Sequence, residues 1–253
     1  MRIPQKTWKK FVADLRKVSD KAAEELELFM DTHRDADGLW NGRETRRSII
    51  DYAFALATKY GEGAGEIACQ MYDAVGVASG ASVPLAEPAA TATYGEVAKT
   101  VNGVLLRTSQ PPMLGSAVGR LVKMSGVDTT MQNAIRDGAE WAWIPSGDSC
   151  PFCRMLASNG WRRASKNAIK NGHAEHIHAN CDCTYAIRFG ETSTVEGYDP
   201  DALYEEYQRA EGHTTKEIVN SMRREDYKKN KNEINAQKRL AYSRRKEIEN
   251  ADQ

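Results

Sequence analysis

The N-terminal half of the chain carries apolar residues at the spacing of an amphipathic helix. Over residues 4–34 they recur every three or four positions, as Trp8, Phe11, Val12, Leu15, Val18, Ala22, Leu26 and Met30. This spacing places them on one face of a helix. Similar patterns predict a second helix over 42–60, ending near Gly61, and a third over about 63–80. The third is rich in alanine and glycine, which favours close approach of neighbouring helices.

The next segments also favour helices. Residues 81–92 contain two prolines and predict a loop, and residues 94–106 predict another helix. The Pro111-Pro112 pair interrupts the chain before one or two further helices that end near residue 139. Nothing in this half has catalytic spacing, and we expect residues 1–139 to form a helical domain.

The composition changes at residue 140. Residues 140–190 are rich in cysteine, histidine, tryptophan and glycine, and TYAIRF at 184–189 alternates like a short strand. Residues 191–253 read as a linker followed by a charged helix. The sequence therefore predicts a mainly α protein with a small α+β module at 140–190 and an extended C-terminal helix.

An internal repeat marks the C-terminal helix. RREDYKKNKNEINAQ at 223–237 returns about 15 residues later as KRLAYSRRKEIENAD at 238–252. From residue 222 onward there are ten basic and six acidic residues. A solvated helix face and a nucleic-acid contact both fit this mild bias, and we favour the solvated face because phosphate binding usually needs a denser cluster.

The bulk composition excludes some classes of protein. Lysine plus arginine equals aspartate plus glutamate, 35 against 35, so net charge gives no indication of a nucleic-acid partner. We find no apolar run near the ~18 residues needed to span a bilayer. The basic N-terminus lacks the apolar segment of a secretory signal. We therefore expect no membrane partner and synthesis in the cytoplasm.

The cysteines are the main chemical signal. Cys69 lies in an apolar helical stretch and is expected to be a small core residue, whereas the other four fall within 34 positions. They form C-x2-C, then 24 residues, then H-x2-C-x-C, which is typical of structural zinc sites. The candidate ligands of Zn²⁺ are Cys150, Cys153, His178, Cys181 and Cys183. We prefer the first three with one of the two downstream cysteines, leaning to Cys181. His173 and His176 are expected in the loop or around the ligands.

Three other chemistries compete with structural zinc. A redox dithiol would follow a strand and open a helix in a βαβ context, which the pattern does not predict. A zinc deaminase pairs H-x-E with P-C-x-x-C, but here His173-Ala174-Glu175 comes after the cysteine pair. An HNH-type treble-clef nuclease also fits a thiolate-rich site, although a clear His-Asn general-base pair is missing.

The cysteine/histidine segment resembles a known signature. DSCPFCRMLASNGW followed by HANCDC is similar to the signature of phage Mu F-like head morphogenesis proteins and related minor capsid proteins of tailed phages. The matching positions are Asp148, Cys150, Cys153, Gly160, His178, Cys181 and Cys183. Ala179 stands where that family commonly has proline, which leaves the donors intact. The resemblance covers roughly 148–189, about a sixth of the chain.

The resemblance implies a structural role in a virion. Such proteins are present in few copies, contact the phage portal protein and the major capsid protein at the capsid interior, and assist head morphogenesis and packaging of double-stranded DNA. It implies no enzymatic activity and no catalytic residues. Candidate contacts to DNA or to an acidic partner patch are Arg162, Arg163, Lys166 and Lys170, with a solvated loop as the alternative. A zinc-dependent nuclease and a non-viral zinc-bound DNA-binding module stay open as alternatives.

Overall fold

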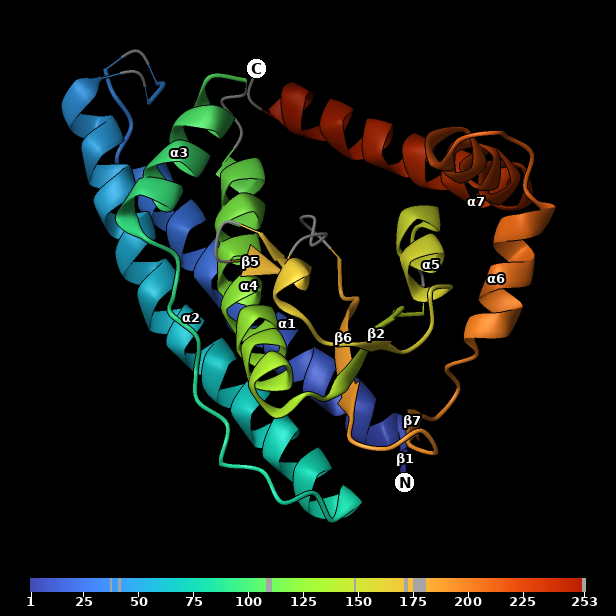
Figure 1. The fold of residues 1–253 in the computed structure, drawn as a ribbon. Coiled ribbons are helices and arrows are strands. Elements are labelled where there is room, and N and C mark those ends of the chain that lie inside the picture. The colour runs from blue at the N-terminus through green and yellow to red at the C-terminus, as the bar shows by residue number, and fades with distance from the viewer. Residues whose placement is uncertain are drawn as a thin grey trace. The chain divides into compact units, whose positions relative to one another are not determined.

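The computed structural model describes residues 1–36, 38–40, 42–107, 111–147, 149–170, 173–174 and 181–251. These residues form seven α-helices and short strands, so the protein is mainly α, as predicted (Figure 1). The chain divides into two compact units. The first comprises Met1–Ser149 and Asn159–Tyr198, and the second comprises Cys150–Ser158 and Asp199–Gln253. The domains predicted at 1–139, 140–190 and 191–253 stay predictions.

Three long helices form the core of the first unit. They are α1 (Gln5–Thr32), α2 (Arg43–Ser79) and α4 (Pro111–Asp137), which pack against one another, while α3 (Tyr94–Leu105) packs on α2 and α4. Six of the eight predicted stripe residues of α1 are buried, whereas Val12 and Val18 are half-buried. The buried residues are Trp8, Phe11, Leu15, Ala22, Leu26 and Met30, together with Ser19, which was not predicted. The helical period of the sequence therefore identified the core face of α1 correctly.

The predicted break near Gly61 is wrong, because α2 runs without interruption from Arg43 to Ser79. Gly61 lies inside this helix, where a Cβ atom would come within 2.8 Å of the Ser125 hydroxyl on α4. At Gly65 a Cβ atom would come within 3.2 Å of Pro88. Gly61 and Gly65 instead allow α4 and the loop after α2 to approach α2 closely.

Polar side chains on α4 hold the proline-containing loop that precedes α3. The Asn133 side chain donates to the Glu87 carbonyl at 2.8 Å and accepts from the Glu87 amide at 3.0 Å. The Thr129 hydroxyl accepts from the Ala89 amide at 2.9 Å. The predicted loop is thus a fixed strap, since its backbone groups find partners on the helix beneath it. The strap ends at Thr93, which caps α3 in a capping box.

A small antiparallel sheet completes the first unit. Its strands are ordered β3 (Arg162–Arg163), β2 (Glu140–Ile144) and β6 (Thr184–Arg188). The predicted strand at 184–189 is confirmed, whereas β2 was not anticipated. Trp143 pairs with Tyr185 across the strands, and their rings meet edge to face at 4.8 Å. Two smaller pairs are β1 (Arg2–Ile3) with β7 (Thr194–Val195), and β4 (Ile169–Lys170) with β5 (His173–Ala174).

The second unit consists of α5 (Pro151–Ala157), α6 (Pro200–Arg209) and α7 (Thr215–Ala251). Helix α5 packs on α6 and on α7. Arg154 of α5 joins them, since its guanidinium contacts Glu206 at 3.1 Å and Asp226 at 2.8 Å. The charged C-terminal helix is confirmed as α7. Helix α5 was missed because seven residues are too few to show a helical period, although Pro151 at its start is a known signal.

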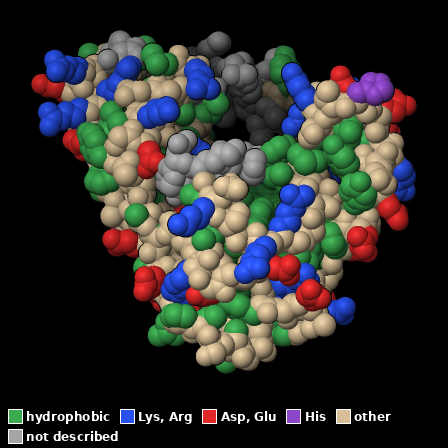
Figure 2. All heavy atoms as spheres, viewed as in Figure 1, with side chains coloured by type: hydrophobic (Ala, Val, Ile, Leu, Met, Phe, Trp, Pro, Cys, Tyr) green, Lys and Arg blue, Asp and Glu red, His purple; other side chains and the backbone are tan. Residues whose placement is uncertain are grey.

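Charges of both signs cover the molecule. On the face shown in Figure 2, lysine and arginine side chains and acidic side chains are both present, as the balanced composition suggests. Among the described residues, no helix is long and apolar enough to cross a membrane.

Candidate metal centre

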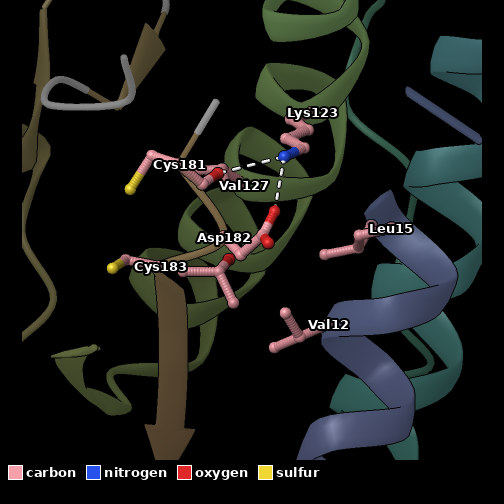
Figure 3. Close-up of a pocket in the computed structure, with 8 residues that line it drawn as sticks. Val12, Leu15, Lys123, Val127, Cys181, Asp182 and Cys183 are labelled. Atoms are coloured by element: carbon pink, nitrogen blue, oxygen red, sulfur yellow. Dashed lines mark hydrogen bonds and ion pairs between the residues drawn. The ribbon is translucent and has the colours of Figure 1, made fainter. Parts of the chain in front are cut away.

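Residues 181–183 lead into strand β6 and carry two of the candidate ligands. Side chains alternate along extended chain, so Cys181 and Cys183 lie on one side and Asp182 on the other. Figure 3 shows both sulfurs on the side away from α1, while the Asp182 carboxylate points toward Lys123. Both thiols are buried. The two thiols are therefore positioned to bind the same ion.

Asp182 fastens this segment to the helical core. Lys123 of α4 donates to the Asp182 carboxylate at 2.9 Å and to the Cys181 carbonyl at 3.0 Å. Arg16 of α1 donates to the other carboxylate oxygen at 3.0 Å. The charge of Asp182 is the main reason that the pKa of Arg16 is raised. The backbone between the two thiols is thus held from two helices.

The Cys183 sulfur also has a partner in the first unit. The Ser146 amide donates to it at 3.3 Å, and the Ser146 hydroxyl lies 3.7 Å away. Ser146 follows β2, and the register that pairs Ile144 with Thr184 places it beside Cys183. An N–H donor at sulfur favours the thiolate, which is the form that binds metals.

The Cys153 thiol, on α5, completes a group of three. The sulfur atoms of Cys153, Cys181 and Cys183 all lie within 4.8 Å of one another, and all three residues are buried. Two thiolates on one tetrahedral ion, with Zn–S bonds of about 2.3 Å, lie about 3.8 Å apart. The three donors are therefore close enough to hold a metal ion.

The remaining predicted ligands are placed differently. Cys150 is the N-cap residue of α5, is half-buried, and does not belong to the group of three within the described chain. His178 lies outside the described residues, as do Asp148 and His176. The backbone of His173 forms part of β5, and its side chain is not described. The structure thus brings together three of the five candidates.

Cys69 is a core residue, as predicted. It is buried on α2, and burial raises the pKa of its thiol to about 11. At neutral pH such a thiol stays protonated, and a protonated thiol is neither a good nucleophile nor a metal ligand. Cys69 therefore offers a natural control for experiments on the other four cysteines.

Three of the four basic candidates are exposed on the first unit. Arg162 and Arg163 are exposed on β3, and Lys166 is exposed in the 3-10 turn Lys166–Ala168. Arg162 donates to the Asn159 side chain at 2.6 Å. The Lys170 backbone belongs to β4, and its side chain is not described. A partner contact for these residues stays a prediction.

Sequence reasoning missed the residues that position the ligands. Lys123 and Arg16 lie on helices 58 or more residues away from Cys181, and no local pattern relates them to it. A signal was present in Asp182, since an acidic residue between two ligands in extended chain must face the opposite side. A carboxylate held on that side needs a cationic partner, and here Lys123 and Arg16 supply it.

Comparisons with known proteins identify the family. A family model described as VG15 protein matches residues 2–210, which include the three-thiol group and every element from β1 to α6. No curated protein and no solved structure matches the chain. Because the family model covers most of the sequence, the chain belongs to the VG15 family of viral proteins.

Proposed function

We propose that this chain is a minor capsid protein of a tailed phage. In this proposal it resides in the virion, at the capsid interior near the portal vertex, after synthesis in the host cytoplasm. It contacts the portal protein and the major capsid protein and assists head morphogenesis and DNA packaging. The role is structural and non-enzymatic.

The observation that carries the proposal is the three-thiol group in a chain of a viral family. Cys153, Cys181 and Cys183 are buried and within 4.8 Å of one another, in the segment that resembles the head morphogenesis signature. Thiolate donors select soft or borderline ions such as zinc. A donor set rich in thiolates, with nothing yet assigned to activate water, suits a structural site better than a catalytic one.

The zinc ion would be held by these three thiolates and one further donor. The sequence offers His178 and Cys150 for the fourth position. When bound, zinc supplies a crosslink between segments that are distant in the sequence, and the binding energy becomes folding energy. Lys123, Arg16 and Ser146 hold the downstream thiols in place for this purpose.

The metal part of the proposal is tested by analysis of the purified full-length protein. We expect about one zinc per chain. Cys183→Ala should lose it, while Cys69→Ala should keep it, because Cys69 lies outside the group. Single changes of His178 and Cys150 to alanine identify the fourth donor, because the loss of the true ligand lowers zinc affinity. A metal-free wild-type protein that binds no added zinc would contradict the site.

The capsid part is tested by co-expression with a portal and a major capsid protein. We expect wild type and Cys69→Ala to enter assembled heads in few copies, and Cys183→Ala to be depleted from them. Mass spectrometry of purified heads gives the copy number. Heads that form normally without the protein, and that never contain it, would refute this role.

The nuclease alternative has its own test. The full-length protein is incubated with plasmid DNA and Mg²⁺ or Zn²⁺. Under our proposal the plasmid stays intact. Cleavage that is lost in His178→Ala would replace the structural role with a treble-clef nuclease.

A further inference from the structure

Helix α7 carries a row of positive charges that the metal site does not explain. Positions 224, 228, 231, 235, 238 and 242 follow one another at alternating steps of four and three, so they form one stripe along the helix. Four of them are basic, and we call Arg224, Lys228, Lys231 and Lys238 the basic stripe. The other two positions are Asn235 and Tyr242.

The acidic residues of this part of α7 lie on other faces. At 100° per residue, Glu225, Asp226 and Glu233 point about 100° to 200° away from the stripe. Asp226 faces α5, where it pairs with Arg154 at 2.8 Å. The helix therefore uses one side for packing within the second unit and leaves its basic side in solvent.

The basic stripe is exposed and little neutralised. All four of its side chains are exposed. Lys228 pairs with Glu225 at 2.7 Å, but both side chains are more than half exposed, and such surface pairs are weak. Glu225 also interacts electrostatically with Arg224, whereas no ion pair in the described part of the chain involves Lys231 or Lys238. The basic stripe therefore presents positive charge to solvent, where an anionic partner can bind.

We propose that the basic stripe of α7 binds the phosphate backbone of double-stranded DNA. From Arg224 to Lys238 the helix rises about 21 Å, about the length of six base pairs. Charges arranged in a line along a helix complement a linear polyanion better than a local acidic patch on a protein. The sequence repeat continues the helix to Ala251 and returns Arg224 as Arg239.

Other anionic partners fit the helix less well. Insertion into an anionic membrane needs an apolar face. Among the described side chains of α7, the exposed large apolar ones are scattered, and they are Tyr227, Leu240 and Tyr242. Single-stranded nucleic acids are bound on rows of aromatic rings, and the scattered Tyr227 and Tyr242 do not form such a row. The wide major groove of B-form DNA admits a helix, whereas the deep and narrow major groove of duplex RNA does not.

The test is titration of a fluorescently labelled 24-base-pair duplex with the full-length protein, followed by anisotropy at several salt concentrations. We expect wild type to bind with Kd of about 1–100 µM near physiological salt, as for non-specific DNA contacts. Lys228→Gln/Lys231→Gln/Lys238→Gln should bind more weakly. Three lost phosphate contacts lower the salt slope by about 2.7, so the affinity loss between 50 and 200 mM salt becomes about 40-fold smaller.

The matched control removes three charges elsewhere. Lys6, Lys9 and Lys17 are exposed on α1, and changing all three to glutamine alters net charge by the same amount. We expect this control to bind like wild type. Glutamine and lysine have similar helix propensity, and circular dichroism verifies that α7 is intact.

Three results would overturn the inference. They are no binding by wild type at 50 mM salt, an equal loss of binding in the α1 control, and equal or tighter binding to a duplex RNA of the same sequence. The inference names a DNA-contacting surface for the proposed head protein, but its test requires neither capsids nor zinc. Failure of either proposal is therefore seen independently of the other.

Discussion

Replacing Lys123 with methionine removes the cation that holds the Cys-x-Cys segment to α4. The Lys123 side chain is 14% exposed and that of Asp182 is 24% exposed, so this ion pair is largely shielded from water. A hydrogen bond to a charged group contributes about 1.5–3 kcal/mol, and breaking a fully buried pair costs about 3–5 kcal/mol. Arg16 still contacts Asp182, but its side chain is 60% exposed and compensates weakly.

We therefore expect Lys123→Met to lower the free energy of unfolding by about 2–3 kcal/mol. Adding Asp182→Asn should recover part of this loss, because the carboxylate left without its main cation is then gone. The double-mutant cycle should give a coupling of about 1–2 kcal/mol. Lys59→Met is the control, since Lys59 forms an ion pair with Glu25 but is 63% exposed, and we expect almost no change.

The assay is urea unfolding followed by tryptophan fluorescence, with a chelator present so that metal makes no contribution. The chain has five tryptophans, at positions 8, 40, 141, 143 and 161, and all belong to the first unit. The signal therefore reports the unit that contains Lys123 and Asp182. A Lys123→Met protein as stable as Lys59→Met, or a cycle without coupling, would refute the reasoning.

Three further changes test other parts of the structure. Gly126→Ala should lower the free energy of unfolding by about 1–3 kcal/mol, because the new Cβ would lie 3.0 Å from the backbone of α2. At Gly95 a new Cβ meets no atom within 4 Å, so Gly95→Ala should raise the free energy of unfolding by up to about 1 kcal/mol. Urea unfolding measures both changes. Hydrogen bonds from Arg136 lower the pKa of the Asp137 carboxyl below its ordinary 3.8. The contribution of Asp137 to stability is therefore complete above about pH 3.8 and is lost as the pH falls through its lowered pKa. As pH falls below about 4, Asp137→Asn should thus lose stability less steeply than wild type in acid titrations monitored by fluorescence. Finally, the Cys69 thiol should react with a thiol reagent only when the protein unfolds. Mass spectrometry of the labelled native protein checks this, and modification of Cys69 in the native protein would contradict its burial.

The helical core was largely readable from the sequence, because helix faces obey a local period. The stripe from Trp8 to Met30 predicts the buried face of α1 without any knowledge of its neighbours. The prediction of a helix end at Gly61 was wrong because the role of this glycine is set by a distant residue. Its role depends on the Ser125 hydroxyl 64 residues later, and a close contact between helices leaves no mark in a local pattern.

The elements of the cysteine-rich segment were harder to predict. Helix α5 and strand β2 are too short for their periods to stand out, and each is fixed by packing with partners from other parts of the chain. Trp143 illustrates this, since its burial follows from pairing with Tyr185 on β6 and not from its own neighbours. The residues that position the ligands, Lys123 and Arg16, come from two different helices.

The spacing of the cysteines predicted a metal site but left one of Cys181 and Cys183 without a role. The alternation of extended chain removes the need to choose, because residues two apart face the same side. With Asp182 held on the opposite side by Lys123, both sulfurs face the same way, within 4.8 Å of Cys153. If both are ligands, alanine at either position should abolish stoichiometric zinc. If one variant keeps a full zinc complement, the metal is held by the alternative set, in which Cys150 and His178 both bind.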